Sequence, residues 1–123
     1  MTMDEIDKKQ LYNTAWNHWG SNMQLDILIE EMAEFTQAIL KARRNGVTYS
    51  YSFYEEMADV LICMEQVETR LKDFPDKCDY DKHVILSTCW DRVMEIKEKK
   101  LLRLKERLFD DTARDAEGIV GVE

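Results

Sequence analysis

The sequence predicts an all-α fold, and three features of its 123 residues lead to this expectation. Apolar residues recur every three or four positions in several long segments, as they do on one side of a helix. Leu, Met, Glu and Lys, which favour helix, are abundant, whereas only four glycines and one proline are present to form turns. We therefore expect a single α-helical domain of four main helices over residues 1–109, followed by an acidic, mobile tail over residues 110–123.

Two helices are expected in the first third of the chain. Thr2, followed three residues later by a glutamate, has the pattern of a capping box that starts the first helix, and Gly20 ends this helix. Ser21 and Gln24 form a second capping-box pattern, which starts a long helix running from about residue 22 to residue 44. The Asn-Gly pair that follows is a typical helix stop.

Two further helices are expected after this stop. Ser52 and a glutamate three residues later start the third helix, and the Phe-Pro pair at 74–75 ends it. The fourth helix is expected from about Lys82 to Leu108, and its apolar residues follow a near-heptad spacing. Its second half is basic, because residues 92–107 contain seven Lys or Arg against three Glu.

Acidic residues of the second and third helices form two pairs with helical spacing. Glu31 and Glu34 lie three residues apart, as do Glu56 and Asp59, so each pair shares one side of its helix. If the two helices pack side by side, the four carboxylates converge near the core. The first pair borders an apolar stripe formed by Leu25, Leu28, Met32, Phe35 and Ile39.

Four negative charges in a poorly solvated place are unstable without a cation. A hard divalent ion suits carboxylate ligands, so Mg²⁺ is the expected partner, with Mn²⁺ as the alternative. The competing interpretation is that these acids belong to solvated helix faces with ordinary surface ion pairs. With only two histidines and no Gly-rich phosphate loop, the chain has no signature of a histidine-based zinc site or a P-loop.

The pattern Glu30-Glu31-x-x-Glu34, followed after a linker by Glu56-x-x-Asp59, resembles the signature of the MazG-like all-α nucleoside triphosphate pyrophosphohydrolases. The resemblance covers about residues 19–107, most of the chain. It implies a four-helix MazG-like bundle that assembles as a homodimer or homotetramer. It also implies Mg²⁺-dependent hydrolysis of a (deoxy)nucleoside triphosphate to the monophosphate and pyrophosphate.

The resemblance further implies roles for the acids. Glu31, Glu34, Glu56 and Asp59 would be metal ligands, and Glu30 or Glu34 would deprotonate or orient the attacking water. Two alternatives stay open. One is a related pyrophosphohydrolase of the phosphoribosyl-ATP or dimeric dUTPase type, and the other is a non-catalytic helical dimerisation module whose acids are surface charge.

Basic residues are the candidates for contacts with the phosphates. Lys100, Arg103 and Arg107 share one side of the fourth helix and resemble a basic stretch on the last core helix of some family members. Lys41 lies near the end of the second helix. Ordinary solubilising charge is the alternative role for all four residues.

Trp19 and Gln24, just before the first acidic pair, are the candidates for base binding. An indole offers a stacking face for a nucleobase, and an amide offers hydrogen bonds to its edge. The resemblance supports this placement, since some relatives have a similar Trp-Gly-x-x-x-Gln arrangement. Core packing is the alternative role for Trp19.

Composition restricts the partners and the location of the protein. The net charge of -8, from 17 basic and 25 acidic residues, argues against nucleic-acid binding. No apolar run is long enough to span a bilayer, and the N-terminus has no signal-peptide pattern, so we expect a cytoplasmic protein without a membrane partner. Cys63, Cys78 and Cys89 are scattered, which predicts reduced thiols and no disulfide framework.

Overall fold

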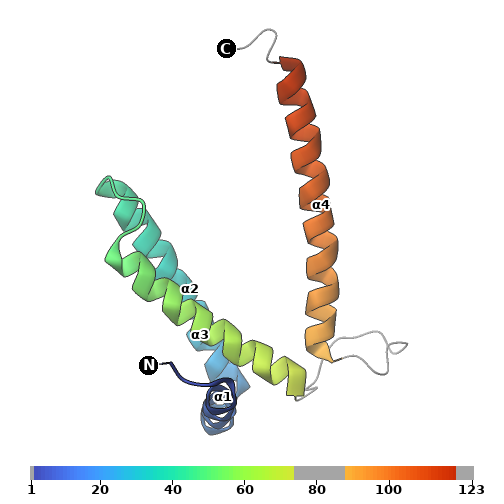
Figure 1. Ribbon diagram of the computed structural model, residues 1–123. Coiled ribbons are helices and arrows are strands. Elements are labelled where there is room, and N and C mark those ends of the chain that lie inside the picture. Colours follow the sequence, from blue (N-terminus) through green and yellow to red (C-terminus); the bar gives the residue numbers. More distant parts are fainter. Residues whose placement is uncertain (1, 74–87, 119–123) are drawn as a thin grey trace. The chain divides into compact units, whose positions relative to one another are not determined.

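The computed structural model describes residues 2–73 and 88–118, with side chains described as far as Asp111. These residues form four helices and no strand, which confirms the all-α prediction (Figure 1). The chain divides into two units, residues 1–76 and 77–123. The helices are α1 (Glu5–Trp19), α2 (Ser21–Arg44) and α3 (Tyr51–Asp73) in the first unit, and α4 (Cys89–Gly118) in the second.

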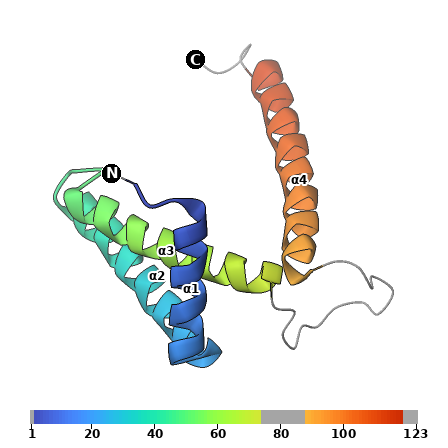
Figure 2. The same cartoon turned by 60° about the horizontal axis from the view of Figure 1, so that its bottom comes forward.

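Helices α2 and α3 form an antiparallel hairpin in the first unit, and they lie side by side in both views (Figures 1 and 2). The turn between them occupies residues 45–50. Gly46 has a φ of +72°, a backbone conformation that glycine adopts without a steric penalty. The amides of Gly46 and Val47 donate to the carbonyls of Arg43 and Ala42, at 3.0 and 2.9 Å. This Schellman arrangement confirms the expected Asn-Gly stop.

Small and aromatic side chains fill the contact between α2 and α3. Ala38 and Ala42 are buried, and their short side chains allow the two backbones to approach closely. The rings of Phe35 and Phe53 meet edge to face, with their centroids 5.0 Å apart. Cys63 is buried on the α3 side of this contact.

Helix α1 is held against the hairpin by buried aromatics with polar tips. The Trp16 ring is buried, and its indole N–H donates to the Ser21 hydroxyl at 2.9 Å. The guanidinium carbon of Arg70 on α3 lies 6.0 Å from the centroid of the same ring, a cation–π distance. Tyr12 is also buried, and its hydroxyl donates to Glu65 on α3 at 2.5 Å.

Two helix starts differ from the sequence prediction. The N-cap of α1 is Asp4, whose carboxylate accepts from the amide of Asp7 at 2.8 Å, so the cap expected at Thr2 is wrong. Ser50, not Ser52, caps α3, because its hydroxyl accepts from the amide of Phe53 at 3.1 Å. Several Ser, Thr and Asp residues precede each helix, and spacing alone does not choose among them.

The pair Ser21 and Gln24 is not a capping box, although α2 begins where it was expected. Gly20, with a φ of +88°, occupies the N-cap position and provides no side-chain cap. The Ser21 hydroxyl is engaged by Trp16, as described above. The amide of Gln24 is buried and donates to the side chain of Gln66 on α3 at 2.9 Å. The Ser21 hydroxyl and the Gln24 amide therefore form contacts with other side chains instead of capping α2.

Helix α4 begins later and ends later than expected. Thr88 and Asp91 form a reciprocal capping box at its start, at 3.2 and 2.9 Å. The helix continues to Gly118, ten residues past the expected end at Leu108. The expected first turn, residues 82–87, lies outside the described residues.

Two of the three cysteines lie in the described part of the chain. Cys89 is disulfide-bonded, so the prediction of reduced thiols is wrong for this residue, whereas Cys63 is a free, buried thiol. Cys78 lies outside the described residues. The cytoplasmic location, which rested partly on reduced thiols, stays a prediction.

None of the helices in the described ranges contains an apolar stretch long enough to cross a membrane.

The Tyr12–Glu65 hydrogen bond is expected to contribute measurably to the docking of α1. Tyr12→Phe removes the donor of this partly buried hydrogen bond, which should lower the free energy of unfolding by about 1 kcal/mol. Urea denaturation followed by circular dichroism measures this change. Tyr51→Phe, at a ring that is 77% exposed, is the control and should leave the free energy unchanged. Equal stability of all three proteins would contradict this role of Tyr12.

Candidate metal centre

Three of the four predicted acids meet at the contact between α2 and α3. Glu31 from α2, and Glu56 and Asp59 from α3, each place one carboxylate oxygen within 4.8 Å of those of the other two. Glu56 and Asp59 lie on one side of α3 because they are three residues apart, and Glu31 lies on the side of α2 that carries the buried Ala38. We call these three residues the acidic cluster.

Two oxygens of the acidic cluster lack the partners that buried polar atoms normally have. The Oε2 atoms of Glu31 and Glu56 are shielded from solvent and have no hydrogen-bond partner in the described part of the chain. Buried carboxylate oxygens are usually hydrogen-bonded, because desolvation without a partner is costly. A cation between the two helices would satisfy both oxygens, and a set of carboxylate oxygens suits a hard divalent ion such as Mg²⁺.

Electrostatics of the acidic cluster favour either protonation or a bound cation. The pKa of Glu31 is raised above its ordinary value, first by burial and then by the charges of Glu34, Asp59 and Glu56. The pKa of Glu56 is raised in the same way, first by burial and then by the charges of Glu34 and Asp59. Like charges with little access to water disfavour ionisation, and a divalent cation reverses this effect.

Glu34, the fourth predicted ligand, adjoins the acidic cluster but is exposed to solvent. Glu34 contributes to the raised pKa of both Glu31 and Glu56, so its carboxyl group lies near both of them. Glu30, which precedes Glu31 in the chain, is exposed as well. Glu34 therefore lies on the solvent side of the half-buried Glu31 and Glu56.

Cys63 is a neighbour of the acidic cluster that the sequence analysis did not assign to the site. The residue is 8% exposed, and the pKa of its thiol is raised by burial and by the charges of Glu31 and Asp59. The spacing could have revealed it, because Cys63 lies four residues after Asp59 and thus one turn further along α3. Burial and the raised pKa both disfavour the reactive thiolate form of Cys63.

The two residues predicted to bind a base have different surroundings. Trp19 is the last residue of α1, is 53% exposed, and meets the His18 ring edge to face at 5.0 Å. Gln24 is buried and bonded to Gln66, and it precedes Glu31 by seven residues, about 10 Å along the axis of α2. Only Trp19 therefore offers an open side-chain surface.

The predicted phosphate-binding residues are all exposed. Lys41 lies ten residues after Glu31, about 15 Å along the axis of α2, so the structure does not bring it to the acidic cluster. Lys100, Arg103 and Arg107 belong to α4 in the second unit and project from one side of that helix.

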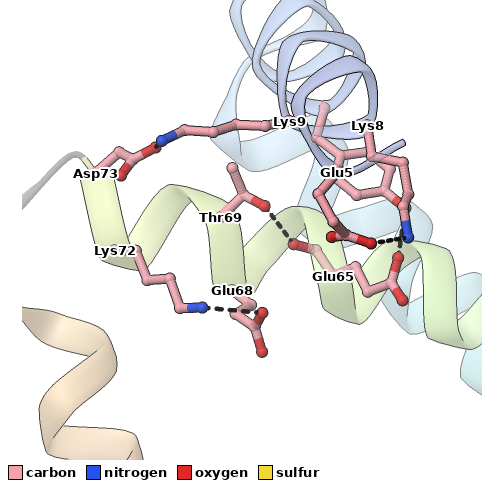
Figure 3. Close-up of a pocket in the computed structure, with 9 residues that line it drawn as sticks. Glu5, Lys8, Lys9, Glu65, Glu68, Thr69, Lys72 and Asp73 are labelled. Carbon is pink, nitrogen blue, oxygen red and sulfur yellow. Dashed lines mark hydrogen bonds and ion pairs between the residues drawn. The ribbon is translucent and has the colours of Figure 1, made fainter. Parts of the chain in front are cut away.

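A separate recess of about 360 Å³ lies between α1 and the C-terminal half of α3 (Figure 3). Its lysines are paired with acids: Lys8 with Glu5 at 2.7 Å, and Lys72 with Glu68 at 3.3 Å. Lys9 of α1 pairs with Asp73 of α3 at 2.8 Å. Of these three ion pairs, Lys9–Asp73 joins α1 to α3, as the Tyr12–Glu65 hydrogen bond does, whereas the other two pairs each lie within one helix. We assign the recess a structural role.

The raised pKa values of the acidic cluster predict a pH-dependent cost in the metal-free protein. A carboxyl group whose pKa is raised by folding stabilises the folded state below its ordinary pKa of 4.5, and this contribution is lost as the pH rises past the raised value. Glu31→Gln removes the ionisable group. Its melting temperature in EDTA should therefore be close to that of the parent at pH 4 and should exceed it increasingly toward pH 7.

Glu30→Gln is the control for this experiment, because the side chain of Glu30 is exposed one position away. It should show no gain that grows with pH. Added Mg²⁺ at pH 7 should raise the melting temperature of the parent more than that of Glu31→Gln. A difference between Glu31→Gln and the parent that is constant over the whole pH range would contradict the electrostatic origin.

Comparisons with known proteins identify no relative of this chain. No protein-family model matches it, and no significant match is found among curated proteins or solved structures.

Proposed function

We propose that the protein is a Mg²⁺-dependent nucleoside triphosphate pyrophosphohydrolase, which hydrolyses a (deoxy)nucleoside triphosphate to the monophosphate and pyrophosphate. The observation that carries this proposal is the acidic cluster, with two shielded carboxylate oxygens that lack hydrogen-bond partners. The resemblance to the MazG-like signature supplies the substrate class and the bond that is cleaved. The proposed fold of the active protein is accordingly a four-helix MazG-like bundle.

The donors of the acidic cluster fit a hard divalent cation. Glu31, Glu56 and Asp59 would hold Mg²⁺, and Glu34 would complete the set from the solvent side. When bound, the ion would supply a Lewis acid that neutralises phosphate charge and lowers the pKa of a nearby water. The shielded oxygens of Glu31 and Glu56 would then have the partner that they lack.

The exposed acids would handle the attacking water. Glu34 lies near the half-buried Glu31 and Glu56 and is exposed, so a carboxylate oxygen of Glu34 can accept the proton that the water loses. Glu30 is the alternative acceptor, or it orients the water by a hydrogen bond. The protonated carboxyl group later returns its proton to solvent, and its exposure makes this exchange rapid.

Basic residues would hold the phosphates that leave as pyrophosphate. Arg103 and Arg107 can bind phosphate oxygens with two N–H groups each, and Lys100 adds a point charge on the same side of α4. Lys41 is proposed to bind the phosphate farthest from the metal, because it is separated from the acidic cluster along α2. Trp19 is proposed to stack on the base, whereas Gln24 would have to give up its bond to Gln66 to bind one.

Loss of a cluster acid is expected to abolish turnover without unfolding the protein. Asp59→Asn and Glu34→Gln should each reduce Mg²⁺-dependent hydrolysis to background, because they remove a proposed ligand and a proposed proton acceptor. Product chromatography across a panel of nucleotides measures turnover, and circular dichroism verifies the helix content. Asp26→Asn, at an exposed acid elsewhere on α2, is the control and should retain activity. Full activity of Asp59→Asn would remove that residue from the site.

A measurement of melting temperature separates the enzyme from a non-catalytic dimerisation module. An enzyme of this class should gain melting temperature from Mg²⁺ together with a non-hydrolysable nucleotide, and a module whose acids are only surface charge should not. Rate ranking across the nucleotide panel separates the proposed enzyme from the phosphoribosyl-ATP and dUTPase types.

Hydrolysis is expected to release pyrophosphate from attack at the α-phosphorus. The absence of a Gly-rich phosphate loop from the sequence favours this outcome over γ-phosphate transfer, and the MazG-like resemblance assigns the α position. Turnover in ¹⁸O-labelled water followed by mass spectrometry should place the label in the nucleoside monophosphate. Label in pyrophosphate alone would indicate attack at the β-phosphorus, and release of orthophosphate with a nucleoside diphosphate would refute the proposal.

A further inference from the structure

The negative charge of this chain is unevenly distributed, and one end of the α2–α3 hairpin carries none of it. Residues 35–54 contain three cationic side chains, Lys41, Arg43 and Arg44, and no Asp or Glu, although the whole chain has a net charge of -8. The expectation that nucleic acids do not bind was based on this net charge. It does not describe the end of the hairpin, where positive charge is in local excess.

We call residues 43–54, which include the turn between α2 and α3, the hairpin tip. The side chains of Arg43 and Arg44 are exposed, and neither forms an ion pair within the described ranges. The hydrogen bonds of α1 reach Ser21 and Glu65, and the turn lies at the other end of the hairpin (Figure 1). Both arginines are therefore available to an anionic partner.

Three exposed tyrosines follow the arginines in the hairpin tip. Tyr49, Tyr51 and Tyr54 are 63%, 77% and 56% exposed. Phe53, which packs against Phe35 of α2, also contacts two of these rings. Its ring meets those of Tyr49 and Tyr54 edge to face, with centroids 5.3 and 6.1 Å apart. An edge-to-face contact leaves at least one face of each tyrosine ring clear of Phe53.

The backbone of the hairpin tip is fixed before any partner binds. The bonds of Gly46 and Val47 to the end of α2, and the Ser50 cap of α3, hold the turn in one conformation. The space beside Gly46 is open, since no atom lies within 4 Å of the place where a Cβ would be. Groups held in this way lose less conformational entropy on binding than groups on a flexible loop.

We propose that the hairpin tip binds single-stranded nucleic acid, with the arginines on backbone phosphates and the tyrosines stacked on bases. Cations that follow the phosphates and aromatic faces that stack on successive bases are the two features that proteins use to bind single strands with little sequence preference. The proposal does not rest on the proposed catalytic function, because these arginines and tyrosines are not part of that site.

An acidic peptide is the competing partner, because the arginines would attract it as well. Protein interfaces are centred on anchors that fill well-packed pockets, whereas the hairpin tip is a turn at the end of two helices (Figure 1). Bases offer flat faces to the three exposed rings, and an acidic peptide does not. A duplex keeps its base faces inside the stack. The tyrosines therefore favour a single strand over both of these partners.

The test uses the full-length chain, a fluorescein-labelled oligothymidylate of about 20 nucleotides and fluorescence anisotropy. EDTA is present, so neither binding through a metal at the acidic cluster nor hydrolysis of the probe contributes. Arg43→Gln combined with Arg44→Gln should reduce the slope of log affinity against log salt by about 1.4, because each lost phosphate contact accounts for about 0.7. Lys97→Gln combined with Lys105→Gln removes the same charge from α4 and should leave the slope unchanged.

A second pair of variants tests the stacking independently of charge. Tyr51→Ala should raise the dissociation constant about ten-fold or more, because one base loses its aromatic partner. Tyr51→Phe keeps the ring and should bind the probe as the parent does. Tyr51 is largely exposed, so neither change should disturb the helices, and circular dichroism verifies this. Equal binding by Tyr51→Ala and the parent would contradict the stacking.

Competition against the labelled probe separates the possible partners. Unlabelled oligothymidylate or oligouridylate should displace the probe, and the stronger competitor identifies the preferred sugar. A duplex of the same length and an oligoglutamate peptide of the same charge should displace it far less. The proposal is overturned by a parent that does not bind the probe, or by equal weakening in the arginine pair and the α4 pair. Oligoglutamate that competes as well as the single strand would also overturn it and would assign the hairpin tip to an acidic peptide.

Discussion

The close contact between α2 and α3 is the constraint on which the rest of this structure depends. Ala38 and Ala42 bring the two backbones together, and the same approach brings Glu31 toward Glu56 and Asp59. In the metal-free hairpin, apolar packing stabilises the α2–α3 contact, whereas repulsion among the carboxylates destabilises it. A bound cation would make the two terms cooperate, because the apolar contacts and the carboxylate ligands then favour the same helix separation.

Helical periodicity predicted the four helices, and it placed on facing sides three of the four acids that were expected to converge. A spacing of three residues puts two carboxylates on one side of a helix whatever the surroundings. The caps were predicted less well, since Asp4 and Ser50 compete with other nearby capping residues. The capping box expected at Ser21 and Gln24 does not form, because both side chains make tertiary hydrogen bonds instead. Ser21 bonds with Trp16, and Gln24 bonds with Gln66.

Exposure was the other property that spacing did not determine. The stripe that contains Leu25 and Met32 follows a helical period, and a period shows only that residues share a side. The side of α2 that faces α3 is instead the one that carries the buried Ala38 and Ala42. Cys63 was missed for a related reason, because one thiol has no pattern of its own and acquires its high pKa from burial and from acids on two helices.

The short turn between α2 and α3 has a consequence for how the site assembles. Glu31 and Glu56 are separated by 25 positions, and a six-residue turn folds the chain back between them. The entropy lost in closing this loop is therefore largely spent once the hairpin forms, and a cation binding afterwards adds little to it. Contacts of such short sequence separation also favour rapid folding. A cation bound across the hairpin would therefore slow the unfolding of the α2–α3 contact more than it accelerates the formation of that contact.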